Sequence, residues 1–220
     1  MVKRIHLRIL ASPSINHDDA HAVEKAARFF KGYGIGYDIT PLSRENLRPV
    51  RYSSFMNDVL SHPDMHLISD LATGRILDTL REALSTRDMI GIGITAQSLF
   101  SREGIKKREL LGAGLFASCA FLSTRSIITP QGYRHSPLSR DKIIEALAKH
   151  EMGHVLMDRD GHCQNDGCIM RSNSKSIERF LDMVAKNLGF CNPCQVAISK
   201  GILMLESGAI WRGSGILDGV

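Results

Sequence analysis

The sequence contains few aromatic residues and no apolar stretch that could cross a membrane. Aromatic residues make up 6% of the 220 residues, with a single tryptophan. Every apolar run falls short of the roughly 20 residues that a membrane-spanning helix needs. The first residues, MVKRIHLRIL, contain only a short and interrupted apolar run, unlike a secretory signal peptide. A membrane protein is therefore excluded, and we expect a cytoplasmic location.

The chain also lacks a block of charge of one sign. Its formal net charge is +5, from 28 lysines and arginines and 23 acidic residues that are spread along the sequence. A basic cluster occurs at Arg102 and Lys106–Arg108, but no aromatic residues are interleaved with it, so we interpret residues 101–112 as an exposed loop. Nucleic acid is therefore not an expected partner.

Cysteines are few, and four of the five lie close together near the C-terminus. Cys163 and Cys168 form one close pair, Cys191 and Cys194 form a second, and a segment with a helical pattern (176–188) separates them. This spacing is typical of a tetrahedral four-thiolate zinc site, which is closed and structural. It also suits a reducing cytosol better than a disulfide framework does. Cys119, alone in an apolar stretch, is expected to be a core residue.

The apolar pattern predicts an α/β (α+β) fold with a mixed sheet packed with helices. We expect one compact domain over residues 1–220, in which 1–160 form a sheet-and-helix part and 161–220 a smaller C-terminal part. We predict strands at 4–11, 35–39, 89–95 and within 114–127, and helices at 18–31, 67–84, from Ser139 onward and at 176–188.

The most informative motif is H-E-x-x-H, formed by His150, Glu151 and His154. On a helix the two histidines project from one face and can share a metal ion, while Glu151 can reach a metal-bound water without ligating. A zinc hydrolase needs this combination of neutral imidazoles for the ion and a carboxylate for the proton. A third histidine, His162, follows eight residues after His154.

These residues resemble the archaemetzincins, a branch of the metzincin zinc peptidases. The pattern of that family is H-E-x-x-H-x-x-G-x-x-H-C, four residues, C-x-M, seventeen residues, then C-x-x-C. The match covers His150 to His154, His162–Cys163, Cys168 with Met170, and the pair Cys191 and Cys194. The resemblance implies a metzincin-like fold with two zinc ions per chain, one catalytic and one structural, and it places Met170 at the Met-turn beneath the histidines.

The sequence departs from the family pattern after the second histidine. Met157 replaces the family's glycine, and two extra residues precede His162. Because methionine resists the positive φ that glycine adopts, we expect the helix to run slightly longer and to turn at residues 158–161. Counted without an insertion, the third-ligand position falls on Asp160. We therefore expect His162 as the third ligand, with Asp160 as the alternative.

The resemblance implies a zinc-dependent metallopeptidase that hydrolyses peptide bonds, with Glu151 as general base and then general acid. Its partner would be a peptide or protein substrate, which a cleft-edge strand near residues 121–127 would bind by adding it to the sheet. The alternative is a non-catalytic, zinc-stabilised module that binds protein or nucleic acid. The sequence discloses neither the natural substrate nor the oligomeric state.

Overall fold

The computed structural model describes about half of the chain. The described residues are 5–11, 15–41, 89–96, 99–103, 106–110, 112–114, 119–124, 138–157, 162–171, 177–186 and 189–207. The predicted helix at 67–84 lies outside these ranges. None of the described helices is long and apolar enough to span a membrane.

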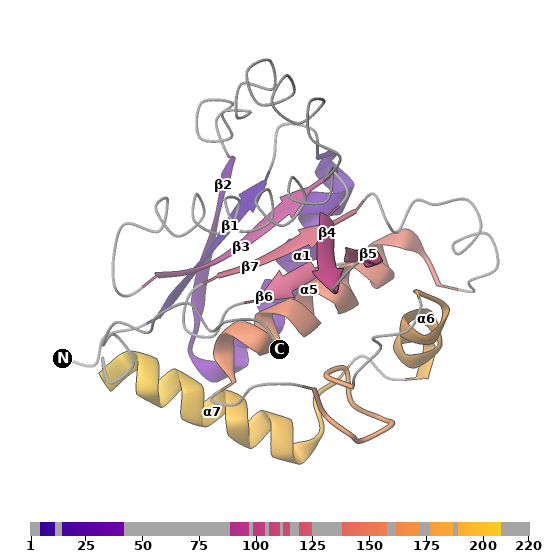
Figure 1. Cartoon of the computed structure of the whole chain (residues 1–220). Helices are drawn as coiled ribbons and strands as arrows, with labels where there is room; N and C mark the ends of the chain where they lie inside the picture. The colour runs from indigo at the N-terminus through magenta and orange to yellow at the C-terminus, as the bar shows by residue number, and fades with distance from the viewer. Residues whose placement is uncertain are drawn as a thin grey trace.

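A five-stranded mixed sheet forms the centre of the molecule (Figure 1). Its strand order is β2-β1-β3-β7-β6, and the first four strands run parallel, whereas β6 pairs antiparallel with β7 at the edge. The bounds are β1 His6–Ala11, β2 Gly36–Pro41, β3 Met89–Thr95, β6 Gly112–Gly114 and β7 Cys119–Ser123. The predicted mixed sheet is confirmed, including its strands at 4–11, 35–39 and 89–95.

The prediction of a loop over residues 101–112 was wrong. Strands β4 (Leu99–Glu103) and β5 (Lys106–Leu110) form an antiparallel ribbon, and β6 follows at once. The register places Glu103 opposite Lys106 and Arg102 opposite Lys107. The charged sequence does not prevent these strands from forming, because antiparallel pairing uses the backbone peptide groups.

Helix α1 (His17–Phe30) begins at Asn16, whose side chain accepts a hydrogen bond from the backbone N–H of Asp19. The helix continues into the short 3-10 turn η1 (Lys31–Tyr33), which Gly34 closes with a φ of 84°. That left-handed backbone is one that glycine adopts without steric penalty. The turn leads directly into β2, so the predicted helix and the strand that follows it are confirmed.

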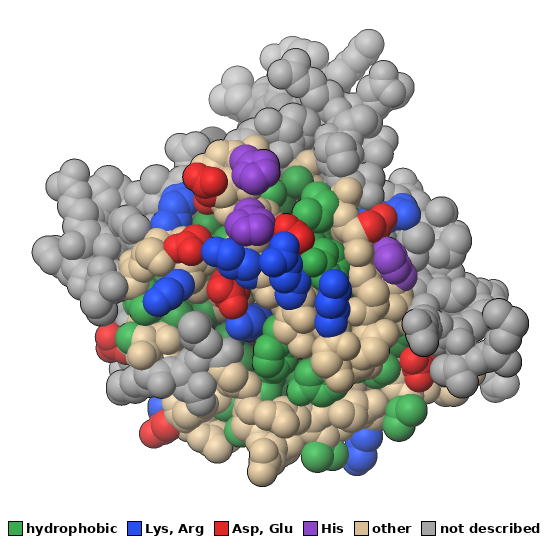
Figure 2. Space-filling view, turned by 180° about the vertical axis from the view of Figure 1, so that it is seen from behind, with side chains coloured by type: hydrophobic (Ala, Val, Ile, Leu, Met, Phe, Trp, Pro, Cys, Tyr) green, Lys and Arg blue, Asp and Glu red, His purple; other side chains and the backbone are tan. Residues whose placement is uncertain are grey.

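The hydrophobic core lies where the sheet meets α1 and α5 (Arg140–Leu156), which also pack against each other. The largest fully buried side chains come from β1, β3, β7, α1 and α5: Leu7, Ile9, Ile90, Ile92, Ile94, Phe121, Leu122, Phe30, Ile143, Ile144 and Leu147. Figure 2 shows that acidic and basic side chains are interspersed on the face seen from behind. The buried side chains of Ile143, Ile144 and Leu147 hold helix α5 on the sheet.

Two further helices follow in the C-terminal part, α6 (Ile177–Lys186) and α7 (Asn192–Ser207). Helix α6 confirms the helix predicted at 176–188, and α7 packs against α5 (Figure 1). Between α5 and α6, residues 162–171 form turns and a single bridge between Cys163 and Arg171. This short stretch contains His162, Cys163, Cys168 and Met170.

The first prediction concerns the ion pair between α1 and α5. Arg140 donates two hydrogen bonds, of 2.8 and 2.6 Å, to the buried carboxylate of Asp19. Asp19→Asn should lower the free energy of unfolding by about 1–3 kcal/mol, because Arg140 loses a charged bidentate partner. Urea denaturation measures this loss.

Asp18→Asn is the matched control. Both aspartates lie in the first turn of α1, so both variants lose the same interaction with the helix dipole, but the Asp18 side chain is exposed. Equal losses of stability in the two variants would show that the pair with Arg140 contributes nothing.

Candidate metal centres

Helix α5 positions the H-E-x-x-H motif. Ser139 precedes the helix with extended backbone, as expected for an N-cap, but its side chain makes no capping bond to a backbone N–H. It bonds instead to the carboxylate of Asp141, and this hydrogen bond lowers the pKa of Asp141. Further along, Ile143 and Leu147 are buried on the face that continues to His150 and His154. The histidines are therefore held by the packing of the helix on the sheet.

The structure brings His150, His154 and His162 together. One ring nitrogen from each lies within 4.8 Å of the others, and the Nε2 atoms of His150 and His154 are 3.1 Å apart. Two nitrogens that bind one tetrahedral zinc ion lie about 3.4 Å apart, given Zn–N bonds of about 2.0–2.1 Å. The arrangement therefore fits one shared ion. Asp160, the alternative third ligand, lies outside the described residues.

A hydrogen bond fixes the orientation of the His150 ring. Its Nδ1 donates to the backbone carbonyl of Ile169 at 2.7 Å, which leaves Nε2 free to accept a metal. Nothing in the sequence pointed to Ile169, because a backbone carbonyl carries no residue-specific signal. This contact also joins α5 to the stretch that carries His162.

Loss of contact with water favours the neutral form of the three imidazoles, and His162 is more exposed than the two histidines of α5. Burial lowers the pKa of His150 to about 4 and the pKa of His154 to about 3, and neighbouring histidines lower both further. Burial lowers the pKa of His162 as well. Neutral imidazole is the form that binds metal, so at neutral pH no proton has to leave these rings first.

Glu151 is buried next to His150 without a hydrogen-bond partner for its Oε2 atom among the described residues. Burial raises the pKa of its carboxyl to about 8. A buried carboxyl oxygen without a partner costs free energy, so this group points to chemistry rather than to stability. Its other oxygen lies against β6, where a Cβ added to Gly112 would be 2.4 Å from Glu151 Oε1. Gly112 was not predicted as a site residue, because it lies next to Glu151 only in the folded chain.

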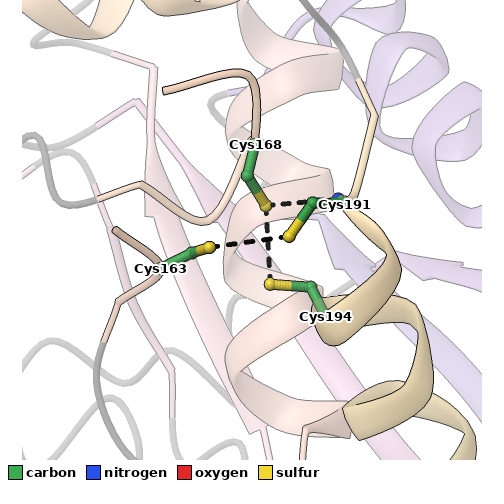
Figure 3. Close-up of side chains that lie close together, drawn as sticks. All are labelled: Cys163, Cys168, Cys191 and Cys194. Atoms are coloured by element: carbon green, nitrogen blue, oxygen red, sulfur yellow. Dashed lines mark hydrogen bonds between the residues drawn. The ribbon is translucent and has the colours of Figure 1, made fainter. Parts of the chain in front are cut away.

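The four clustered cysteines form a second group (Figure 3). The Sγ atoms of Cys163 and Cys191 are 3.6 Å apart and those of Cys168 and Cys194 are 3.4 Å apart. None of the four cysteines is in a disulfide, and a tetrahedral zinc site with Zn–S bonds of about 2.3 Å spaces its sulfurs about 3.8 Å apart. The donor set and spacing therefore fit a closed zinc site. Cys119 lies fully buried in β7, as predicted for a core residue.

Met170 packs against the backbone of α5 at Gly153, between the two histidines of the motif. The Met170 side chain is fully buried, and a Cβ added to Gly153 would lie 2.4 Å from its sulfur atom. Gly153 thus has no side chain at the point where the thioether approaches the helix. This contact places Met170 close to the histidine-bearing turn of α5.

We expected the helix to continue past Met157, and this prediction was wrong. Helix α5 ends at Leu156, and Met157 has extended backbone with φ −80° and ψ 138°. Its N–H still donates to the Gly153 carbonyl, and its side chain is fully buried. The chain therefore leaves the helix without a left-handed residue at this position, which is why methionine is accepted there. The turn predicted at 158–161 lies outside the described residues.

The predicted cleft-edge strand also needs correction. In β7, Ala120, Phe121 and Leu122 pair with β3 on one side and with β6 on the other. Their backbone groups are thus engaged within the sheet, and the outer edge belongs to β6. Residues 125–127 lie outside the described part of the chain.

The fold of this chain is similar to that of a solved archaemetzincin. No protein-family model and no curated protein matches the sequence. The crystal structure of archaemetzincin from Methanopyrus kandleri superposes with a TM-score of 0.60, covering 91% of this chain and 97% of that chain at 15% sequence identity. This chain has an archaemetzincin fold. At this level of identity the similarity establishes the fold, and the activity has to be argued from the site.

The second prediction tests the contact between Met170 and Gly153 within the archaemetzincin fold. Gly153→Ala should lower the free energy of unfolding by about 1–3 kcal/mol, because the new methyl group overlaps the Met170 sulfur. Helix propensity alone would stabilise this variant by about 1 kcal/mol, so the sign separates the two effects. Urea denaturation gives the value.

Gly32→Ala serves as the control, because nothing lies within 4 Å of an added Cβ there. Combining Gly153→Ala with Met170→Ala should recover part of the loss, since the smaller side chain leaves room for the methyl group. Strict additivity of the two substitutions would contradict the contact.

Proposed function

We propose that this protein is an archaemetzincin-type zinc metallopeptidase that hydrolyses peptide bonds. The observation that best supports the proposal is the buried Glu151 carboxyl, which has no partner for Oε2 among the described residues and is adjacent in α5 to the histidine cluster. A purely structural metal site gains nothing from such a carboxyl. The archaemetzincin fold, shared with the Methanopyrus kandleri protein, agrees with this proposal.

Two groups of residues would each hold one zinc ion. His150, His154 and His162 would hold the catalytic ion, whereas the four-cysteine cluster would hold the structural one. Three imidazoles leave one position of a tetrahedral ion open, but four thiolates fill all of them. Zinc bound at the histidines would polarise the scissile carbonyl and acidify the attacking water.

Glu151 performs the proton transfers in this mechanism. Its carboxylate accepts a proton from the attacking water and then delivers it to the leaving amine. Because burial raises the pKa of Glu151 to about 8, the carboxyl needs the positive charge of the bound metal to ionise at neutral pH. His150 keeps its ring in place by donating from Nδ1 to the Ile169 carbonyl.

The substrate would be a peptide or protein that binds along β6. This strand forms the edge of the sheet, so it can pair with an extended peptide through backbone hydrogen bonds. Gly112 of β6 lies against the Glu151 carboxyl, so a peptide held at this edge passes close to the proposed general base. We further propose that the chain works in the cytoplasm, where a reducing environment keeps the four cysteines able to bind zinc.

The third prediction tests the role of Glu151. Glu151→Gln should keep two zinc ions per chain but lower kcat/KM for peptide cleavage by about 10²–10⁴, because the general base is lost while the ligands remain. Digestion of a peptide library, followed by mass spectrometry, identifies a cleaved peptide for the kinetics. Elemental analysis counts the zinc.

Glu206→Gln, on α7, is the control and should cleave at the wild-type rate. If Glu151→Gln cleaves as fast as the wild type, Glu151 is not the general base. If the wild type holds two zinc ions and cleaves no peptide, the non-catalytic binding module replaces the peptidase.

The fourth prediction concerns the space beside Glu151. Gly112→Ala would place a methyl group 2.4 Å from the present position of Glu151 Oε1, so the carboxylate must move. We expect kcat to fall by about 10², the loss that a misplacement of about 1 Å causes, with no loss of zinc. Gly32→Ala again gives the control. An unchanged kcat would show that Glu151 acts from another position.

A further inference from the structure

Residues 162–171, here called the bridging segment, carry members of both metal-binding groups. His162 belongs to the histidine group, and the next residue, Cys163, belongs to the cysteine group, as does Cys168. The other two cysteines come from a separate part of the chain, at the start of α7. The two groups are therefore joined through a single peptide bond between His162 and Cys163.

Backbone hydrogen bonds close the bridging segment on itself. The N–H of Cys163 donates to the Met170 carbonyl at 2.6 Å, and the N–H of Arg171 donates to the Cys168 carbonyl at 3.0 Å. The two ends of the segment thus lie side by side, with a bridge between Cys163 and Arg171. These bonds connect Cys163 and Cys168 directly to the backbone of Met170 and Arg171.

Ile169 links this closed segment to both groups. Its carbonyl accepts the hydrogen bond from His150 Nδ1 at 2.7 Å, and its N–H donates to the Gly189 carbonyl at 2.9 Å. Gly189 lies two residues before Cys191, whose own N–H donates to the Cys168 sulfur at 3.4 Å. The orientation of the His150 ring therefore depends on a peptide that is held between two of the four cysteines.

The cysteine group is the main anchor of the segment. Residues 164–167 are exposed, and the described part of the segment contains neither a helix nor a strand longer than the single bridge. Cys163 and Cys168 are buried where their sulfurs face those of Cys191 and Cys194. Apart from the cysteines, the segment is anchored by the buried side chains of Ile169 and Met170 and by the hydrogen bonds of Ile169 to His150 and Gly189.

We propose that zinc in the four-cysteine group raises the metal affinity of the three-histidine group by holding the bridging segment in place. The four cysteines thus act as positioning residues for His162 and for the Ile169 carbonyl. This inference rests on the proposed function, in which both groups hold zinc. Partners that orient metal ligands typically change metal affinity by about 10–100-fold, and we expect an effect of that size.

The experiment compares the zinc affinity of the histidine group in the wild type and in Cys191→Ser. Cys191 lies outside the bridging segment and is only partly buried, so its substitution removes one thiolate and leaves the segment intact. Competition with a chelator should show that the histidine group of Cys191→Ser binds zinc about 10–100-fold more weakly. Cobalt substitution assigns each ion, since only the cysteine group gives thiolate-to-cobalt charge-transfer absorption.

Cys119→Ala controls for the loss of a cysteine elsewhere and should bind zinc at the histidine group as the wild type does. Equal affinities in Cys191→Ser and the wild type would overturn the coupling but leave the peptidase proposal standing. A wild-type protein whose histidine group binds neither zinc nor cobalt would overturn the peptidase proposal itself. Circular dichroism shows whether each variant is folded.

The reverse measurement does not depend on the folding of Cys191→Ser. Coupling between two binding sites is reciprocal, so an empty histidine group must weaken zinc binding at the cysteines by the same factor. His154→Ala removes a ligand from the histidine group and leaves all four cysteines in place. Its cysteine group should therefore bind zinc about 10–100-fold more weakly than that of the wild type. An unchanged affinity there would also overturn the coupling.

Discussion

The hydrogen bond from His150 Nδ1 to the Ile169 carbonyl is the contact on which the candidate site depends. It selects the ring nitrogen that faces the other histidines, and it joins α5 to residues 162–171. Ile169 is followed by Met170, whose sulfur packs at Gly153 on the same helix. Ile169 therefore orients the imidazole of His150, and the next residue, Met170, packs the C-terminal part of the chain against α5.

Helix α5 can carry this site because it is buried on several sides. It contacts the sheet at β6 and β7, and it packs against α1 and α7. Lys149, His150 and Glu151 are all buried on it, which is unfavourable for three consecutive polar residues. Lys149 is compensated by its ion pair with Glu145 at 2.6 Å, and His150 by Ile169. Of these three residues, Glu151 alone keeps a buried oxygen without a partner among the described residues, as the proposed role in proton transfer requires.

The sequence predicted the elements whose signals are local. The strand at 89–95 follows from a short apolar run, and both candidate metal-binding groups follow from ligand spacing along the chain. Residues 101–112 were misread, because the pairing of β4 with β5 leaves no apolar pattern. Gly112 and Ile169 were missed, because their importance comes from neighbours distant in sequence. The edge position of β6 rather than β7 is likewise a property of the assembled sheet.

The exit from α5 shows how the site accommodates a departure from the family pattern. A glycine after the second histidine allows a sharp left-handed turn, but Met157 takes extended backbone directly after the last helical residue. Its buried side chain adds apolar contact that glycine would lack, worth about 1.5–3 kcal/mol for full burial of a methionine. The sequence also has two residues more than the family pattern before His162, and a ring nitrogen of His162 still lies within 4.8 Å of those of His150 and His154. The replacement of glycine by Met157 is therefore compatible with the three-histidine cluster.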